Sequence, residues 1–152
     1  MAYWGELIVG NTGTGTLTIS DGGQVTNTGN ATIGEVFGSN GSVTVTGENS
    51  AWNNTYSLLV DSLGTGTLTI ADGGIVTNAV GFIGEIVGSN GIVIVTGGTS
   101  VWNNNVSLYV ENGLLTIADG GRVAADHSSG IVYLGTFSSS SGTLNIGAAA
   151  GE

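Results

Sequence analysis

The chain contains no cysteine and no proline, and its only basic residue, Arg122, faces eleven acidic ones. Without cysteine it forms no disulfide and no thiolate metal site. Without proline, every backbone N–H stays available to a β-sheet ladder. Because phosphate binding needs clustered lysine and arginine, nucleic acids and anionic membrane surfaces are poor partners for a chain with a net charge of −10.

The sequence also lacks a secretory signal peptide, a lipidation motif and an apolar run of about 18 residues, so we expect no membrane insertion by this segment. Met1 to Trp4 joins the repeat described below where Trp52 and Trp102 stand, and the final GTLNIGAAAGE opens a turn of the repeat without finishing it. We therefore expect both termini to be cut from a longer protein.

What the chain does have is repetition. The stretches GTGTLTIADGGIVTN and IGEIVGSNG nearly copy earlier ones with a period of about 50 residues, as the following pairs illustrate: Leu17 and Leu68, Ile33 and Ile83, Trp52 and Trp102. The repeats make 1–152 a single segment of three units, each of two rungs: 4–51, 52–101 and 102–152.

Each unit consists of two similar halves of about 25 residues, and each half holds three short strand-like segments. The third strand of each half is predicted in IGEVFG, SLLVD, IGEIVG, SLYVE and YLGTF. This pattern predicts an all-β fold, a right-handed parallel β-helix (solenoid) of about six rungs and about 30 Å length. A propeller also suits a 50-residue unit, but three units are too few to close a ring.

Alternation of apolar and polar residues predicts which side chains face inward. One inward ladder comprises Leu17, Val43, Leu68, Val93, Leu115 and Leu144, and another comprises Ile19, Val45, Ile70, Val95, Ile117 and Ile146. The second strand of each half is expected to end in Val25, Ala51, Val76, Val101 or Val123.

The corners of the rungs carry small and polar residues. Asp21, Asp72 and Asp119 each precede a Gly-Gly pair, which favours Asx-type turns over a calcium site, because calcium needs six to eight oxygens in one place. Asn27, Asn53, Asn78 and Asn103 are expected to form a ladder of side chains that complete backbone hydrogen bonds. No cofactor and no metal site are predicted.

Trp4, Trp52 and Trp102 allow two interpretations. If Ala51 and Val101 point inward like Val25, the tryptophans form an exposed contact face for sugars or protein. If the preceding turn holds one more residue, they fill the core instead, and this second interpretation is preferred.

Threonines on the outward side of the first ladder suggest an alternative function. Paired threonines on a flat β-helix resemble the surface of ice-binding proteins, and the face would comprise Thr16, Thr18, Thr44, Thr67, Thr69 and Thr116. The array is interrupted by Ile92, Ile94, Leu114 and Asn145, and threonine is also a good strand residue.

No catalytic site is predicted, and we expect the chain not to be an enzyme. His127 lies beside Asp126, Ser128 and Ser129, but neighbours along one loop do not converge as nucleophile, base and orienting group. Glu35 and Glu85 would stack two rungs apart, near the carboxylate separation of inverting glycosidases, but the repeat alone produces that spacing.

The motifs GTLTISDGGQVTN, IGEVFGSNGSVTVTG and SAWNN followed by SLLV resemble the passenger-domain repeats of bacterial autotransporter (type V secretion) proteins, repeats also seen in some exported proteins with a C-terminal sorting signal. The resemblance extends from Trp4 to about Gly147. It implies a β-helical passenger segment with structural or adhesive function, extracellular or on the outer-membrane surface in the full-length parent. We therefore expect the chain to be an excised or shortened segment of that parent.

The partners expected for such a segment are a host or cell-surface glycan or protein. A second copy is also expected, because the open ends of a β-helix expose unpaired backbone groups that favour head-to-tail stacking.

Overall fold

The computed structural model describes residues 1–126 and 130–147. One sheet has six parallel strands, each built on a Gly-x-apolar-x-apolar pattern that buries alternate side chains. Its strands are β3 (Thr14–Ile19), β6 (Asn40–Thr46), β9 (Thr65–Ala71), β11 (Gly91–Thr96), β13 (Asn112–Ala118) and β16 (Ser141–Ile146).

A second sheet contains ten strands that form two neighbouring columns. One column comprises β1 (Ala2–Trp4), β4 (Gln24–Asn27), β7 (Ala51–Asn54) and β14 (Arg122–Ala125), and the other comprises β2 (Leu7–Val9), β5 (Ala31–Ile33), β8 (Ser57–Val60) and β15 (Ile131–Leu134). Two long strands, β10 (Ile75–Ile83) and β12 (Val101–Val110), run through both columns.

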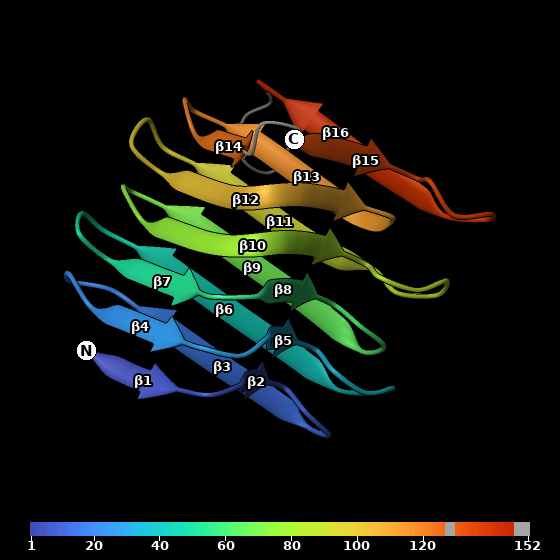
Figure 1. Ribbon diagram of the computed structural model, residues 1–152, viewed down its shortest axis with the longest axis horizontal. Helices are drawn as coiled ribbons and strands as arrows, with labels where there is room; N and C mark the ends of the chain where they lie inside the picture. Colours follow the sequence, from blue (N-terminus) through green and yellow to red (C-terminus); the bar gives the residue numbers. More distant parts are fainter. Residues whose placement is uncertain (127–129, 148–152) are drawn as a thin grey trace.

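The strands stack as a parallel β-solenoid of about six turns, so the fold expected from the repeats is confirmed (Figure 1). Strand register reproduces both predicted inward ladders, with Leu17 opposite Val43 and Ile19 opposite Val45 in the first pair. Val43, Leu68 and Val93 are fully buried. No helix in the described part of the chain is long and apolar enough to cross a membrane.

The tryptophan column corrects the inward pattern of the second strand. Val25 pairs with Trp52, and Val76 pairs with Trp102, so Ala51 and Val101 are not the equivalents of Val25. Val25 follows Ile19 by six positions, whereas Trp52 follows Val45 by seven. This extra residue in the turn rotates the tryptophans into the core.

Buried asparagine side chains form a column within the second sheet, and this column includes only two of the four asparagines predicted for it. Register joins Asn27 to Asn54 and Asn78 to Asn104, and all four are at most 5% exposed. Asn53 and Asn103, which were expected in this ladder, lie one residue earlier on the outward side of the sheet. The same extra turn residue explains this correction.

Two segments expected to be strands are instead corners. IGEVFG and IGEIVG contribute only Ile33 and Ile83 to strands, and the remaining residues project as loops between the two sheets. Gly34 and Gly84 adopt positive φ angles of 75° and 66°, which turn the chain out of the sheet. These loops project along one edge of the solenoid (Figure 1).

Candidate functional site

The proposed tryptophan face does not exist as an exposed surface. Trp52 and Trp102 are fully buried, because the turn before each strand holds the extra residue. Trp4 is 44% exposed, but it pairs with Asn27, while Ala2 occupies the tryptophan column. Two of the three residues are therefore unavailable to a ligand, and the buried interpretation is confirmed for Trp52 and Trp102.

Their indole groups instead satisfy the asparagine column. Trp52 Nε1 donates to Asn27 Oδ1 at 3.0 Å, and Trp102 Nε1 donates to Asn78 Oδ1 at 2.6 Å. Asn78 Nδ2 then donates to Asn104 Oδ1 at 2.7 Å. These polar atoms are inside the solenoid, so they hold rungs together and cannot bind a ligand.

The threonine face is partly present. Register places Thr16, Ser42 and Thr67 in one outward column, and Thr18, Thr44 and Thr69 in the next. Thr16 and Thr18 are exposed and Thr44, Thr67 and Thr69 are half-buried, but Thr116 is only 5% exposed. Thr116 pairs with Ile94 and Asn145, whose larger side chains flank it, so the predicted face ends at β9.

Two buried carboxylates at the sheet corner were not predicted from the sequence. Asp61 and Glu111 occupy the corner position that glycine fills in other rungs, and both are fully buried. Asp61 Oδ2 accepts a hydrogen bond from Asn90 N–H, whereas its Oδ1 has no partner within the described residues. Burial raises the pKa of Asp61, and hydrogen bonds from Asn90 and Gly64 oppose this only in part.

The surroundings of Glu111 stabilise its ionised form much better than those of Asp61 do. Burial alone would raise its pKa, but hydrogen bonds from Thr136, Ser140 and the Phe137 N–H outweigh burial and lower the pKa. The Thr136 hydroxyl donates to Oε1 at 2.6 Å, and its N–H donates to Oε2 at 2.7 Å. The carboxylate therefore anchors the loop of the next rung and is not free for chemistry.

Other candidate residues form no reactive group. Glu35 and Glu85 are half-buried, and Glu85 Oε2 accepts a 3.4 Å hydrogen bond from the Ser62 hydroxyl. His127, Ser128 and Ser129 lie outside the described residues, while Asp126 is exposed. Within 1–126 and 130–147, no three His, Cys, Asp or Glu side chains are grouped to hold a metal.

The predicted aspartate turns have positive φ angles of 53°, 49° and 49° at Asp21, Asp72 and Asp119. Asp72 Oδ2 accepts from Thr46 Oγ1 at 3.2 Å, and Asp119 Oδ2 accepts from Thr96 Oγ1 at 2.9 Å. Each bond joins one turn to the threonine of the rung before it.

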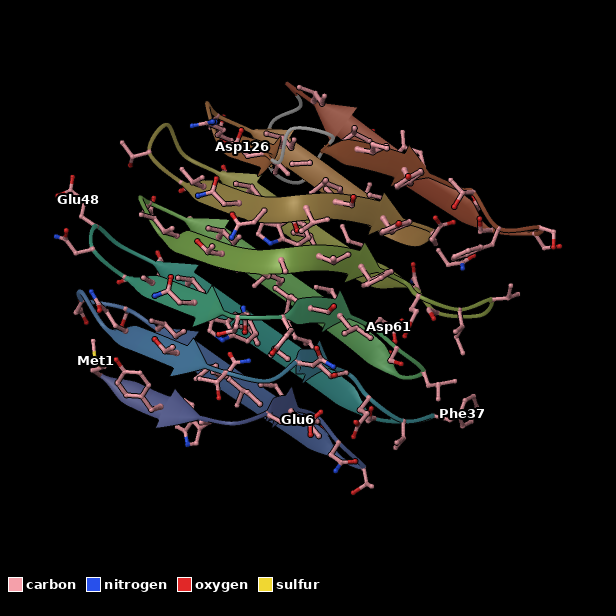
Figure 2. All side chains as sticks on the ribbon, viewed as in Figure 1. Met1, Glu6, Phe37, Glu48, Asp61 and Asp126 are labelled. Carbon is pink, nitrogen blue, oxygen red and sulfur yellow. The ribbon has the colours of Figure 1, made fainter. Side chains whose placement is uncertain are left out.

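Two apolar surface features were missed in the sequence. Phe82, Tyr109 and Tyr133 stack outside the second sheet, with ring centroids 4.9 and 4.5 Å apart. Their recurrence at rung spacing could have revealed this column. Phe37, 91% exposed, projects from the corner loop after β5 (Figure 2), and Leu63 and Val87 on nearby corners are also exposed.

The last rung exposes part of its apolar interior. Val132, Leu134 and Ile146 are 45%, 47% and 72% exposed, although Leu108 and Val110, which pair with the first two, are fully buried. Ile117, which pairs with Ile146, is largely covered. The C-terminal face of the described solenoid therefore presents apolar side chains and an unpaired strand edge.

Comparison with known proteins gives no identification: no protein family matches the chain, and neither a curated protein nor a solved structure resembles it closely enough to count as a match.

Proposed function

We propose that the chain is a non-enzymatic, structural and adhesive β-helical segment of an exported bacterial surface protein, and that its copies stack head to tail. The exposed apolar end of the stack carries this proposal. Val132, Leu134 and Ile146 continue inward ladders that begin at Leu7, Val9 and Ile19.

Burial favours such stacking. Covering these side chains with the first rung of another copy removes apolar surface from water, at about 25 cal/mol per Å². It also pairs the free edges of β14, β15 and β16 with β1, β2 and β3. The same polarity at each junction produces a filament instead of a closed dimer.

Light scattering coupled to size-exclusion chromatography, together with electron microscopy across protein concentration, tests this stacking. We expect filaments with an axial repeat of about 30 Å, six rungs at sheet spacing. Ile146→Glu places a charge on the exposed end and should abolish the filaments. Ile75→Glu, at an outward position of a middle rung, is the matched control and should not. A monodisperse monomer at all concentrations would overturn the stacking proposal.

Adhesion is tested separately, by measuring binding of the labelled chain to bacterial and host cell surfaces. Saturable binding that competes with unlabelled chain supports the adhesive role. Binding no greater than that of an unrelated acidic protein of the same size contradicts it.

Ice binding is the second candidate, supported by the two outward columns of threonine and serine on β3, β6 and β9. Thermal hysteresis measurements should then detect activity in the wild type and none after Thr67→Leu with Thr69→Leu. Thr26→Leu with Thr77→Leu changes two outward threonines on the other sheet and is the control. Equal hysteresis in the two double variants, or none in the wild type, would exclude this function.

A further inference from the structure

Counted from the N-terminus, the first to sixth rungs contain β3, β6, β9, β11, β13 and β16, respectively. The fifth rung turns its corner with fewer residues than the other rungs. The inward Leu115 follows the inward Val110 by only five positions. On the third rung Leu68 follows Val60 by eight positions, and on the fourth Val93 follows Ile83 by ten. The chain therefore passes almost directly from β12 to β13, while the loops on both sides project farther (Figure 1).

This short corner leaves a notch. The projecting loops before β11 and β16 are two rungs apart, or about 9.6 Å, and the missing loop leaves the thickness of one rung open between them. An open cleft of about 480 Å³ lies at this place. Its lining consists of Ser89, Asn90, Asn112, Gly113, Leu114, Ser141 and Thr143.

The walls of the notch offer neutral hydrogen-bonding groups. The side-chain amide of Asn90 and the hydroxyls of Ser141 and Thr143 have no partner among the described residues; the backbone N–H groups of Asn90 and Ser141 are bonded to Asp61 and Asn112. All three side chains are exposed. Leu114 supplies a half-buried apolar surface beside them.

The floor is fixed. Asn112 Nδ2 donates to Ile86 O at 3.0 Å, and Asn112 Oδ1 accepts from Ser141 N–H at 3.3 Å, so this side chain joins the two walls. Glu111 next to it is held by the loop of the sixth rung and is fully buried. Asn112 therefore links both walls, and the lining of the notch contains no charged side chain.

We propose that this notch binds a neutral saccharide, and this proposal rests on the adhesive function proposed above. Sugar hydroxyls both donate and accept, as do the free amide and hydroxyls of the walls. The C–H face of a pyranose ring is apolar and fits against Leu114. The few polar groups that converge on the notch would fix the orientation of the sugar.

Other ligand classes fit less well. An anionic sugar or phosphate would meet a chain of net charge −10, with no basic side chain in the notch. An extended peptide would need unpaired backbone groups, but β13 is paired with β11 on one side and with β16 on the other. Only side-chain groups remain for recognition.

Titration of the isotope-labelled 152-residue chain with cellobiose, maltose, lactose and N,N′-diacetylchitobiose tests the notch. We expect the amide signals of Asn90, Gly113 and Ser141 to shift with at least one of these sugars. Asn90→Ala with Thr143→Ala should weaken that binding at least about tenfold. Asn40→Ala with Thr16→Ala alters exposed residues of the same outward columns on earlier rungs, and should leave it unchanged.

A second variant fills the notch, by replacing Glu111–Gly113 with the longer third-rung corner Asp61–Gly66. It should lose sugar binding. The proposal is overturned if none of the four sugars shifts these signals, or if binding survives in Asn90→Ala with Thr143→Ala. If that variant still adheres to cell surfaces, the notch is not the adhesive site, although the adhesive function stands. If the wild type itself does not adhere, the adhesive function is refuted.

Discussion

At the scale of single residues, every strand of the first sheet carries a glycine at or near its beginning. The column consists of Gly15, Gly41, Gly66, Gly91, Gly113 and Gly142. A Cβ on Gly66 would collide with the Asp61 N–H and with Ile33 O, both backbone atoms that cannot move independently. The glycine is therefore required by close backbone approach across the corner.

Gly66→Ala should consequently lower the free energy of unfolding by about 2–3 kcal/mol, the cost of overpacking a rigid site. Gly13→Ala is the matched control, since nothing lies within 4 Å of its Cβ and its φ is not positive. Urea denaturation of both variants makes the comparison. Equal stabilities would mean that the corner relaxes around the methyl group.

Asp61 and Glu111 occupy the same corner position two rungs apart, yet they should respond in opposite directions to loss of charge. Glu111→Gln should destabilise the fold by about 2 kcal/mol at pH 7, because it weakens several charge-assisted hydrogen bonds. Asp61→Asn should stabilise it by about 1 kcal/mol, because the replaced charge is buried with one oxygen unpartnered.

The pH dependence distinguishes the two carboxylates. The lowered pKa of Glu111 means that its stabilisation is present above the unfolded value, about 4.3, and is lost as pH falls through the folded value. The raised pKa of Asp61 means that its ionisation costs stability above the folded value, and this cost disappears as pH falls. Thermal unfolding between about pH 3 and 7 should show both variants converging on the wild type at the acidic end; parallel curves would contradict this account.

At the scale of elements, the hydrogen bonds between tryptophan and asparagine join neighbouring rungs inside the core. Asn78 both accepts from Trp102 and donates to Asn104, so its loss leaves two buried groups without partners. Asn54 donates one long bond of 3.4 Å to Thr77 O, and its Oδ1 has no partner in the described structure.

Asn78→Ala should therefore cost about 3–4 kcal/mol of unfolding free energy, and Asn54→Ala about half as much, although both remove the same atoms from a buried column. Chemical denaturation with tryptophan fluorescence as the signal measures both. If the two variants lost equal stability, the cavity would dominate and the hydrogen bonds would contribute little.

These elements also show how far sequence alone could lead. Alternation of apolar residues predicted the ladder from Leu17 to Leu144, because a period of two fixes the inward side of a strand once one member is placed. The same reasoning left two interpretations for Trp52 and gave Ala51 as a possible inward residue, since one residue added to a turn reverses every side chain after it. Counting the residues between Val45 and Trp52 would have corrected the register.

Other features depended on contacts between rungs that no local pattern records. The donors to Glu111 come from the loop at Thr136 to Ser140, about 25 residues later, where the repeat has diverged. The interval of 22 residues between Val93 and Leu115 was the one available sign of the notch, because a shorter interval must remove residues from a corner.

At the scale of the whole molecule, odd and even rungs differ. The even rungs carry the loops after Ile33, Ile83 and Leu134, and in the described strands the buried tryptophans belong to the third and fifth rungs. Each solenoid rung contacts only its neighbours, so stability is about the sum of rung and interface terms. A pair of rungs is thus the smallest piece that can be removed without creating a new kind of interface.

Deletion of residues 52–101 should therefore leave a folded solenoid of four rungs. It joins Ala51 to Trp102 in register, and Trp102 Nε1 then meets Asn27 Oδ1 as Trp52 does in the wild type. We expect cooperative unfolding with the denaturant m value reduced by about a third, because m follows the surface exposed.

Deletion of residues 51–74 is the sharper comparison. It removes fewer residues than the first deletion, but it removes a single rung instead of a pair. It joins Ser50 to Ile75 in register and sets the projecting loops after Ile33 and Ile83 on adjacent rungs, where they compete for the same space. This chain should be less stable than the one that lacks 52–101, despite being longer. Circular dichroism during urea unfolding measures both chains; greater stability of the one-rung deletion would show that the rungs are interchangeable.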